Sequence, residues 1–218
     1  MKCRLVIFDL DGTLIDTIAD LGTAVNEALA SKGLPLHSLE EYRGMVGHGV
    51  RNLVRKAMPE PVREDEVLLD TLLEKFLSYY LAHIDVHSRA YPGVPELLAE
   101  LQAAGVQLAV ASNKFQAGTE RLLRRTFPGV RFAAVRGGRP DLPLKPDPAI
   151  IREILTCTGV RPEETVMVGD SGTDIATAAA AGIPCVAVTW GFRPKAALRD
   201  ADRIVENVSQ LREILLAE

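Results

Sequence analysis

Two aspartates, two positions apart, directly follow a short apolar run near the start of the chain. The run covers residues 4–8, and D-L-D-G-T follows it at residues 9–13. A carboxylate at the end of a buried strand can attack phosphorus and form an aspartyl-phosphate, which makes Asp9 the predicted nucleophile. Asp11 points the same way along an extended chain. It can protonate the leaving oxygen and later deprotonate the attacking water.

Three further segments supply the other groups that phosphoryl transfer needs. They are S-N-K at 112–114, L-K-P-D-P at 144–148 and G-D-S-G-T-D at 169–174. A transferring phosphoryl group needs a cation to neutralise its oxygens and donors to hold them. From these segments and the first motif we predict the following substrate-binding residues: Thr13, Ser112, Asn113 and Lys145.

A magnesium site is predicted beside Asp9. Mg²⁺ takes oxygen ligands in proteins and keeps several waters. Asp170 would add a second carboxylate. Asp174 lies four residues further on, so a helix that starts between them would bring it to the same shell. With Mg²⁺ as cofactor, the predicted metal ligands are Asp9, Asp11, Asp170 and Asp174.

Short apolar runs predict the strands that must position these groups. They cover residues 4–8, 106–111, 131–135, 165–169 and 184–189. Several are apolar almost throughout, which is typical of strands buried on both faces of a parallel sheet. Helical periodicity fills the intervals, so we predict an α/β protein with a Rossmann-like doubly wound parallel sheet. Ligands of such a sheet bind beyond the carboxyl ends of its strands, where all four polar segments fall.

One stretch interrupts this alternation of strands and helices. Residues 15–85 show helical stripes but no convincing strand, and a simple crossover between parallel strands needs far fewer residues. We therefore predict a helical cap domain over 15–85, inserted into an α/β core domain made of 1–14 and 86–218. The hinges are expected near 14–17 and 84–92.

Two residues of the predicted cap are candidates for substrate contact. G-H-G at 47–49 lacks the G-x-x-x-x-G-K-[ST] pattern of a phosphate loop, so we interpret it as a bend. His48 and Arg51 lie where selectivity is expected, and Arg51 could pair with a substrate carboxylate. The competing interpretation is a solvated helix start. Trp190 and Phe192, after the last predicted strand, are interpreted as packing residues rather than a stacking surface.

The composition of the chain disfavours several classes of function. The 218 residues carry a net charge of −4, which does not favour a nucleic-acid surface. No segment approaches the ~20 apolar residues of a membrane span, and no secretory signal is recognised. The 3 cysteines lack C-x-x-C spacing, so we expect no disulfide framework or zinc site. We expect a cytoplasmic monomer or homodimer that acts on a small phosphorylated metabolite.

The four polar segments resemble, in order and spacing, the four motifs of the haloacid dehalogenase superfamily. In that family the leading Asp of the first motif is the nucleophile, and the Asp two residues later is the acid and base. The second motif ends in Ser or Thr, the third is Lys, and the fourth is acidic and holds magnesium. The resemblance implies these roles for Asp9, Asp11, Ser112, Lys145, Asp170 and Asp174. A helical cap after the first motif is also a family feature.

Within the superfamily, several runs resemble phosphoglycolate phosphatases. They are D-L-D-G-T-L-I-D-T (9–17), V-G-H-G-V (46–50), Y-P-G-V (91–94), A-S-N-K (111–114), G-D-S-G-T-D (169–174) and G-G-R-P-D-L-P-L-K-P (137–146). Arg139 departs from that branch, because we expect an acidic residue at its place. The resemblance implies a magnesium-dependent phosphatase that hydrolyses a small phosphomonoester through an aspartyl-phosphate, with 2-phosphoglycolate as the leading substrate.

Other activities use the same core and stay open. They are a pyrophosphatase, a sugar-phosphate phosphatase and a β-phosphoglucomutase, which would return the phosphoryl group to a sugar. A dehalogenase is disfavoured because it has no use for an acid at position 11. A phosphonoacetaldehyde hydrolase would need a cap lysine, for which Lys32 and Lys56 are the candidates before residue 75. A non-catalytic phosphate-binding or partner-binding module is disfavoured because every catalytic position is filled. Taken alone, D-x-D-G-T would also fit a strand followed by a tight turn that has no catalytic role.

Overall fold

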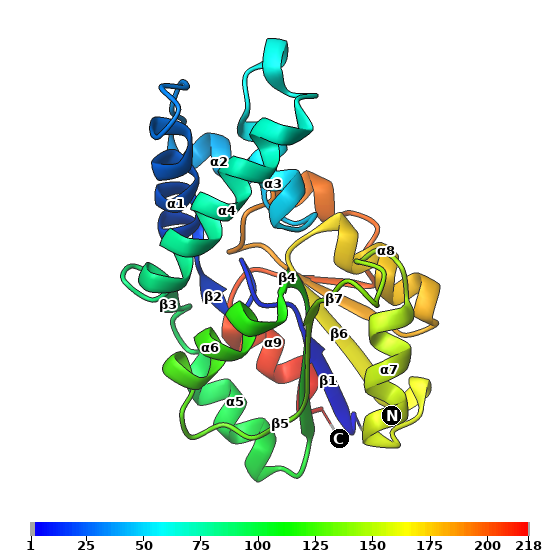
Figure 1. Ribbon diagram of the computed structural model, residues 1–218. Helices are drawn as coiled ribbons and strands as arrows, with labels where there is room; N and C mark the ends of the chain where they lie inside the picture. Colours follow the sequence, from blue (N-terminus) through cyan, green and yellow to red (C-terminus); the bar gives the residue numbers. More distant parts are fainter. Residues whose placement is uncertain (1–2, 218) are drawn as a thin grey trace.

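A parallel sheet of six strands lies at the centre of the molecule. The structure, a computed structural model, describes residues 3–217. Across the sheet the strands follow this order: β5 (Phe132–Gly138), β4 (Gln107–Phe115), β1 (Leu5–Phe8), β6 (Thr165–Gly169), β7 (Cys185–Val188) and β8 (Arg203–Val205). All neighbouring pairs are parallel. In this order β1, the first strand of the chain, lies inside the sheet between β4 and β6 (Figure 1). The predicted α/β class with a parallel sheet is confirmed.

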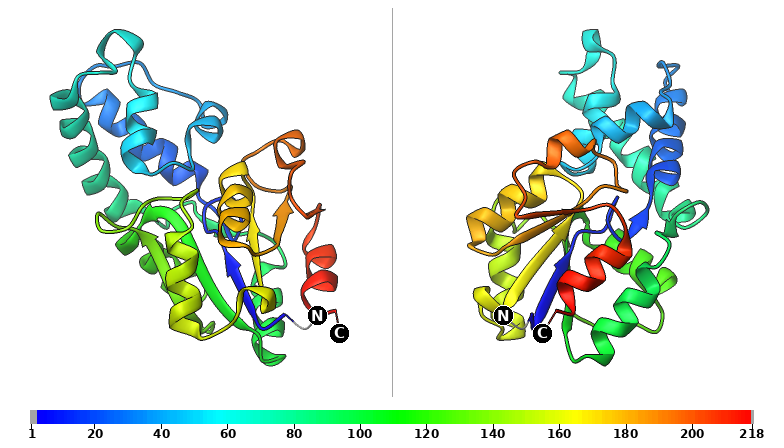
Figure 2. Two further views of the ribbon diagram at one scale, coloured as in Figure 1. Left: turned by 90° about the vertical axis from the view of Figure 1, so that its right-hand side faces the viewer. Right: turned by 180° about the vertical axis from the view of Figure 1, so that it is seen from behind.

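Helices cover both faces of the sheet, because successive side chains of a strand point to opposite faces. Val6 and Phe8 belong to one buried cluster, and Leu5 and Ile7 belong to the other. The first cluster includes side chains of α5 (Val94–Ala103), α6 (Gln116–Thr126) and α9 (Val208–Leu215), and the second includes those of α7 (Ala149–Thr158) and α8 (Gly172–Ala181). Figures 1 and 2 show these groups on opposite sides of the sheet. β1 is apolar throughout because both its faces are buried.

Four helices form an insert between β1 and β4. They are α1 (Ile18–Ala30), α2 (Leu39–Met45), α3 (Val50–Ala57) and α4 (Glu66–His83), with the short 3-10 helix η1 (Glu60–Val62) before α4. They lie above the carboxyl edge of the sheet (Figure 2). The predicted helical insert is thereby confirmed. Its boundaries at 15–85, with a core of 1–14 and 86–218, stay a proposal, and residues 1, 2 and 218 lie outside the described residues.

A short antiparallel ribbon connects the insert to the sheet. β2 (Ile15–Asp16) pairs with β3 (Arg89–Ala90), both inside the segments where we expect hinges. Beside the ribbon, the buried Asp20 carboxylate accepts hydrogen bonds from the backbone N–H groups of His87 and Ser88 at 2.8–3.0 Å. It also accepts from the Ser88 hydroxyl at 2.7 Å. The start of α1 and the returning chain are therefore held together.

Three short elements complete the core, and the sequence did not predict them. η2 (Pro162–Glu164) precedes β6, and η3 (Lys195–Leu198) precedes β8. β8 has only three residues and begins with the exposed Arg203, so it carries no apolar run that predicts a strand. Across residues 3–217, no helix combines the length and apolar character that crossing a bilayer requires.

Candidate active site

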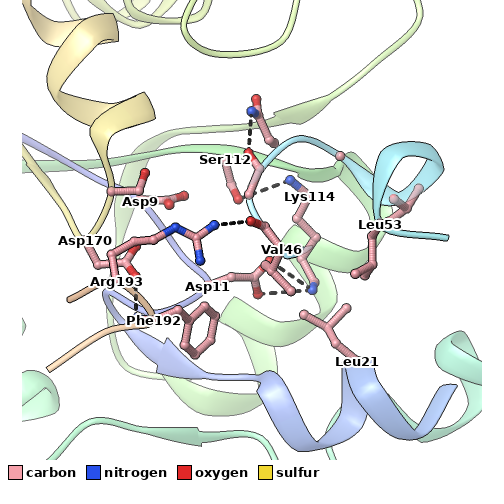
Figure 3. A pocket seen from close by; sticks show the side chains of 15 residues that line it. Asp9, Asp11, Leu21, Val46, Leu53, Ser112, Lys114, Asp170, Phe192 and Arg193 are labelled. Carbon is pink, nitrogen blue, oxygen red and sulfur yellow. Dashed lines mark hydrogen bonds and ion pairs between the residues drawn. The ribbon is translucent and has the colours of Figure 1, made fainter. Parts of the chain in front are cut away.

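Residues distant in the sequence meet at the carboxyl edge of the sheet. Asp9 directly follows β1, Asp170 directly follows β6, and Ser112 lies in β4. Lys145 lies between β5 and α7, and Asp174 lies in the first turn of α8. The carboxyl ends of parallel strands share one edge, so the sheet itself assembles these groups. Figure 3 shows Asp9, Ser112 and Asp170 around one cavity, which insert residues also line.

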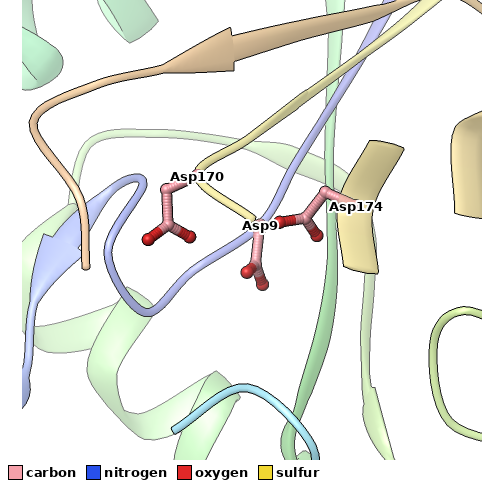
Figure 4. Close-up of side chains that lie close together, drawn as sticks. All are labelled: Asp9, Asp170 and Asp174. Carbon is pink, nitrogen blue, oxygen red and sulfur yellow. The ribbon is translucent and has the colours of Figure 1, made fainter. Parts of the chain in front are cut away.

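Three carboxylates form a buried acidic cluster, which consists of Asp9, Asp170 and Asp174. One oxygen of each lies within 4.8 Å of the others, and Figure 4 shows the three side chains converging. Gly12 makes this approach possible, because a Cβ there would lie 2.4 Å from Asp170 Oδ2. Its φ of +86° is also in the region that favours glycine. Three of the four predicted metal ligands are thus brought together, whereas the Asp11 carboxylate is outside the cluster.

Lys145 supplies the positive charge beneath the acidic cluster. Its Nζ lies 3.0 Å from Asp9 Oδ1 and 2.6 Å from Asp174 Oδ1. It also donates a hydrogen bond to the Ala111 carbonyl at 2.8 Å. Burial alone would lower the pKa of Lys145, but the Asp174 and Asp9 carboxylates outweigh burial and raise its pKa. Lys145 is therefore an ammonium fixed against the predicted nucleophile.

The acidic cluster holds more negative charge than one ammonium can neutralise. Burial, followed by the neighbouring carboxylates of Asp174 and Asp9, raises the pKa of Asp170 to about 8. Burial also raises the pKa of Asp9 to about 7, although Lys145 opposes the shift. Like charges in a buried site disfavour one another unless a cation compensates them. The electrostatics of the cluster therefore favour binding of a cation.

The donor atoms fit a hard divalent cation. Asp9 Oδ1 accepts the Leu10 N–H at 2.7 Å, and Asp170 Oδ2 accepts the Phe192 N–H at 2.7 Å. Within residues 3–217, no hydrogen-bond donor contacts the remaining oxygen of either carboxylate. Free carboxylate oxygens are ligands that Mg²⁺ and Ca²⁺ accept. The acidic cluster can thus hold a metal through Asp9 and Asp170.

Asp174 is engaged differently from the other two acids. Its Oδ2 accepts from the backbone N–H of Ser171 at 3.1 Å and from the Ser171 hydroxyl at 2.6 Å. The Ser171 hydroxyl accepts in return from the Asp174 N–H, which completes a capping box at the start of α8. Oδ1 contacts Lys145, so both oxygens already have protein partners. Asp174 therefore orients Lys145 and adds charge beside the other two acids.

Asp11 is paired with a lysine that the sequence did not reveal as a site residue. Lys114 Nζ lies 3.1 and 3.3 Å from the two Asp11 oxygens. It also donates to the Tyr80 hydroxyl of α4 at 2.6 Å, and the Thr17 hydroxyl donates to Asp11 Oδ1 at 2.8 Å. β4 continues past the predicted end at 106–111, so Lys114 is a strand residue that faces the site.

Asn113 and Arg193 connect the core to the insert above the cavity. Asn113 Nδ2 donates to the carbonyls of Gly47 and Lys145, both at 2.9 Å. Its Oδ1 accepts the Lys145 N–H at 2.8 Å, so the amide is fully engaged. The Arg193 guanidinium, which the sequence did not single out, donates to two backbone carbonyls at the C-terminal end of α2, those of Arg43 and Val46. Figure 3 shows the contact with Val46. These contacts bring the insert down onto the site.

The cavity has a polar floor and an apolar roof. The insert contributes apolar side chains to its lining: Leu21, Val46, Val50 and Leu53. Phe192 completes the lining from the core, although the sequence favoured a packing role for it. Its ring also lies under the Arg43 guanidinium, 5.5 Å from the ring centroid. Trp190 instead donates its ring N–H to the Thr13 carbonyl at 3.2 Å.

Besides Lys145, which contacts Asp9 and Asp174, three predicted substrate residues do not line the cavity. Arg51 is exposed and pairs with Glu66 at 2.6 Å and Asp70 at 2.5 Å, on the insert itself. His48 is exposed at the end of the bend before α3. Thr13 is buried, and its hydroxyl has no hydrogen-bond partner among residues 3–217. The structure does not bring these three side chains to the acidic cluster, and their roles stay predictions.

Known proteins share this sequence and this fold. Residues 6–188 match the family of haloacid dehalogenase-like hydrolases. The phosphoglycolate phosphatase of Mesorhizobium japonicum is 40% identical over 193 residues, which cover 88% of this chain and 85% of that protein. Phosphoglycolate phosphatase 1 of Pseudomonas aeruginosa is 36% identical over 217 residues, 97% of this chain and 78% of its own.

Solved structures of similar proteins have the same fold. A crystal structure from Lactobacillus delbrueckii subsp. bulgaricus, of a protein provisionally designated a phosphoglycolate phosphatase, is 33% identical. It superposes with a TM-score of 0.93 over 100% of both chains. The sheet, the insert and the four strand-end segments thus occur here in the arrangement of a known family. The chain belongs to the haloacid dehalogenase-like hydrolases, as a phosphoglycolate phosphatase-like enzyme that hydrolyses phosphate monoesters.

Proposed function

We propose that this protein is a magnesium-dependent phosphatase that hydrolyses 2-phosphoglycolate through an aspartyl-phosphate on Asp9. The observation that carries this proposal is the acidic cluster, in which Asp9 and Asp170 each keep one oxygen free beside a buried ammonium. A buried carboxylate with a free oxygen, opposite a place for a cation, suits attack on a phosphoryl group.

The chemistry divides into two steps. In the first, an Asp9 oxygen forms a bond to phosphorus, the bond from phosphorus to the ester oxygen breaks, and Asp11 gives that oxygen a proton. In the second, a water oxygen forms a bond to phosphorus, Asp11 takes a proton from that water, and the bond from phosphorus to the Asp9 oxygen breaks, which releases phosphate and the free Asp9 carboxylate. Lys145 and Ser112 hold the phosphoryl oxygens. Bound Mg²⁺, held by Asp9 and Asp170, would neutralise charge on those oxygens.

The choice of 2-phosphoglycolate rests on relatives and on the enclosure of the site. Both of the relatives described above are named for that activity. The roof from α1 and α3 lies directly over the floor, which favours a small substrate over a bulky one. A pyrophosphatase or sugar-phosphate phosphatase would use the same floor, so the substrate needs a direct test.

The test is phosphate release from a panel of compounds, with and without metal. The panel contains 2-phosphoglycolate, pyrophosphate, a hexose phosphate and an aryl phosphate. We expect kcat/KM for 2-phosphoglycolate to exceed the others by about tenfold or more, which corresponds to about 1.4 kcal/mol. Excess chelator should abolish release, and Mg²⁺ should restore it. Normal rates in chelator would contradict the metal requirement, and a sharp preference for another compound would replace the substrate.

A further inference from the structure

Lys114 is a second buried cation at the site, separate from Lys145. Its side chain is 2% exposed, yet it lines the cavity. Its Nζ contacts both oxygens of Asp11 and the Tyr80 hydroxyl, and it lies 4.7 Å from the centroid of the Tyr80 ring. A buried ammonium is expensive to desolvate. None of these contacts involves the acidic cluster, so holding the transferring phosphate does not explain this cation.

Lys114 lies on the side of the site where the leaving alcohol must be. An acid that protonates the leaving oxygen must be within hydrogen-bond reach of it, about 3 Å. The remainder of the alcohol is attached to that oxygen, so it lies near Asp11 rather than near Lys145. Lys114 Nζ is 3.1 Å from the nearer Asp11 oxygen. A substituent two or three bonds beyond the leaving oxygen is therefore within reach of this ammonium.

Other cations are poorly placed for that substituent. Of the described residues that line the cavity, only Lys114 and Arg193 are basic. Arg193 directs its guanidinium to backbone carbonyls of the insert. Lys145 is shared between Asp9 and Asp174. Arg51, our candidate from the sequence, pairs with acids on the surface of the insert.

We propose that Lys114, supported by Tyr80, binds an anionic group on the leaving alcohol and so selects phosphate esters that carry one. The carboxylate of 2-phosphoglycolate is such a group, three bonds from the leaving oxygen. This inference rests on the proposed phosphatase function and adds a substrate class to it. Lys114 is a specificity residue in this account, because it touches the part of the substrate that is not transferred.

The experiment compares two esters of nearly equal size. One is 2-phosphoglycolate, and the other is 2-hydroxyethyl phosphate, whose leaving alcohol is uncharged. In the wild-type enzyme we expect kcat/KM to favour the anionic ester. A hydrogen bond to a charged group contributes about 1.5–3 kcal/mol, so Lys114→Met should reduce this preference by roughly 10- to 100-fold, mainly through KM for 2-phosphoglycolate.

Two further variants make the result specific. Lys114→Arg keeps the charge and should retain much of the preference. Arg193→Met removes the other basic side chain of the cavity and should slow both esters alike, leaving their ratio unchanged. Thermal melting checks that each variant is folded. Should Lys114→Met fail to fold, Lys114→Gln retains a donor for Asp11 and serves in its place.

Three results would overturn the assignment. They are a wild-type enzyme that does not distinguish the two esters, an unchanged ratio in the folded Lys114 variant, and loss of the preference in Arg193→Met. These results differ from failure of the proposed substrate. If the enzyme prefers another anionic ester, the ratio of kcat/KM is measured for that ester and its uncharged analogue. The same dependence of this ratio on Lys114 is expected.

Discussion

Asp9 is the predicted nucleophile, and in the absence of metal its charge also destabilises the fold. Asp9→Asn keeps the shape of the side chain but removes the attacking carboxylate and one of three like charges. We expect turnover of an aryl phosphate to fall by at least about 10³-fold. In metal-free buffer at pH 8 the melting temperature should stay the same or rise, because burial raises the pKa of Asp9 to about 7. Asp141→Asn, an exposed control, should change neither the turnover nor the melting temperature.

Retained turnover in Asp9→Asn would rule out the nucleophile assignment. A folded, inactive variant with a strongly lowered melting temperature would instead show that the carboxylate stabilises the metal-free protein. That result would contradict the charge imbalance of the acidic cluster.

The acidic cluster should also make metal-free stability depend on pH. Folding raises the pKa of Asp9 from 3.8 to about 7 and that of Asp170 from 3.8 to about 8. Between these values the folded protein binds more protons than the unfolded chain, so the free energy of unfolding falls as pH rises. Each group contributes at most about 1.4 kcal/mol per pH unit. Urea unfolding at pH 5–8 in chelator measures the slope.

Two controls identify the source of that slope. Saturating Mg²⁺ should reduce it, because the metal stabilises the ionised carboxylates in the folded state. Asp170→Asn should flatten it in chelator, since one of the two groups is gone. Stability that rises with pH over this range in wild-type protein would contradict the shifted pKa values.

At the scale of single elements, the capping box of α8 connects helix stability to the site. Ser171→Ala removes the hydroxyl that binds Asp174, which in turn contacts Lys145. Asn207→Ala removes the equivalent cap of α9, where the side chain accepts the Gln210 N–H at 3.0 Å. Both changes should lower the free energy of unfolding by about 1 kcal/mol. Only Ser171→Ala should also lower kcat/KM and raise the Mg²⁺ concentration needed for half-maximal activity.

Equal activity in the two cap variants would show that Asp174 holds its position without Ser171. Equal loss of activity would show that general loosening of the core, rather than the orientation of Asp174, lowers the rate.

The strands differ in how far their sequences reveal them. β1 and β6 are predictable because continuous apolar runs mark strands buried on both faces. β2 and β8 are too short for any periodicity to appear. The predicted strand ends at 111, whereas β4 continues to Phe115, because Ser112 and Lys114 are residue types typical of a loop. Both are buried strand residues, but the pairing register of β4 shifts between Ala111 and Phe115, so regular alternation does not place Lys114.

At the scale of the whole molecule, the core motifs and the roof differ in predictability. Asp9, Lys145 and Asp170 follow from the rule that parallel strands end at one edge. Which insert residues face the cavity depends instead on how α1–α4 pack onto the core, and no local pattern encodes that. His48 was a reasonable candidate by position, yet Leu21 and Leu53 line the roof. Arg193 was missed because its contacts with α2 lie about 150 residues away in sequence.

Arg193 should hold the insert closed over the site. It donates to two backbone carbonyls at the end of α2, whereas Arg125 of α6, which pairs at 2.7 Å with Asp85 just after α4, is largely solvated. Arg193→Met should raise KM several-fold for every substrate, because an open insert lets the bound ester dissociate. Backbone hydrogen exchange should increase at residues 43–49. Arg125→Met is the matched control and should have little effect, since exposed ion pairs contribute little.

The two variants also separate closure from simple docking of the insert. If Arg125→Met raised KM as much as Arg193→Met, any contact between core and insert would be enough to keep the insert closed. The position of Arg193 at the cavity would then not be the cause of closure. If Arg193→Met raised KM without faster exchange at 43–49, its guanidinium would act on the substrate directly. Closure through α2 predicts that both quantities change together, because the carbonyls that Arg193 binds precede the bend that forms part of the roof.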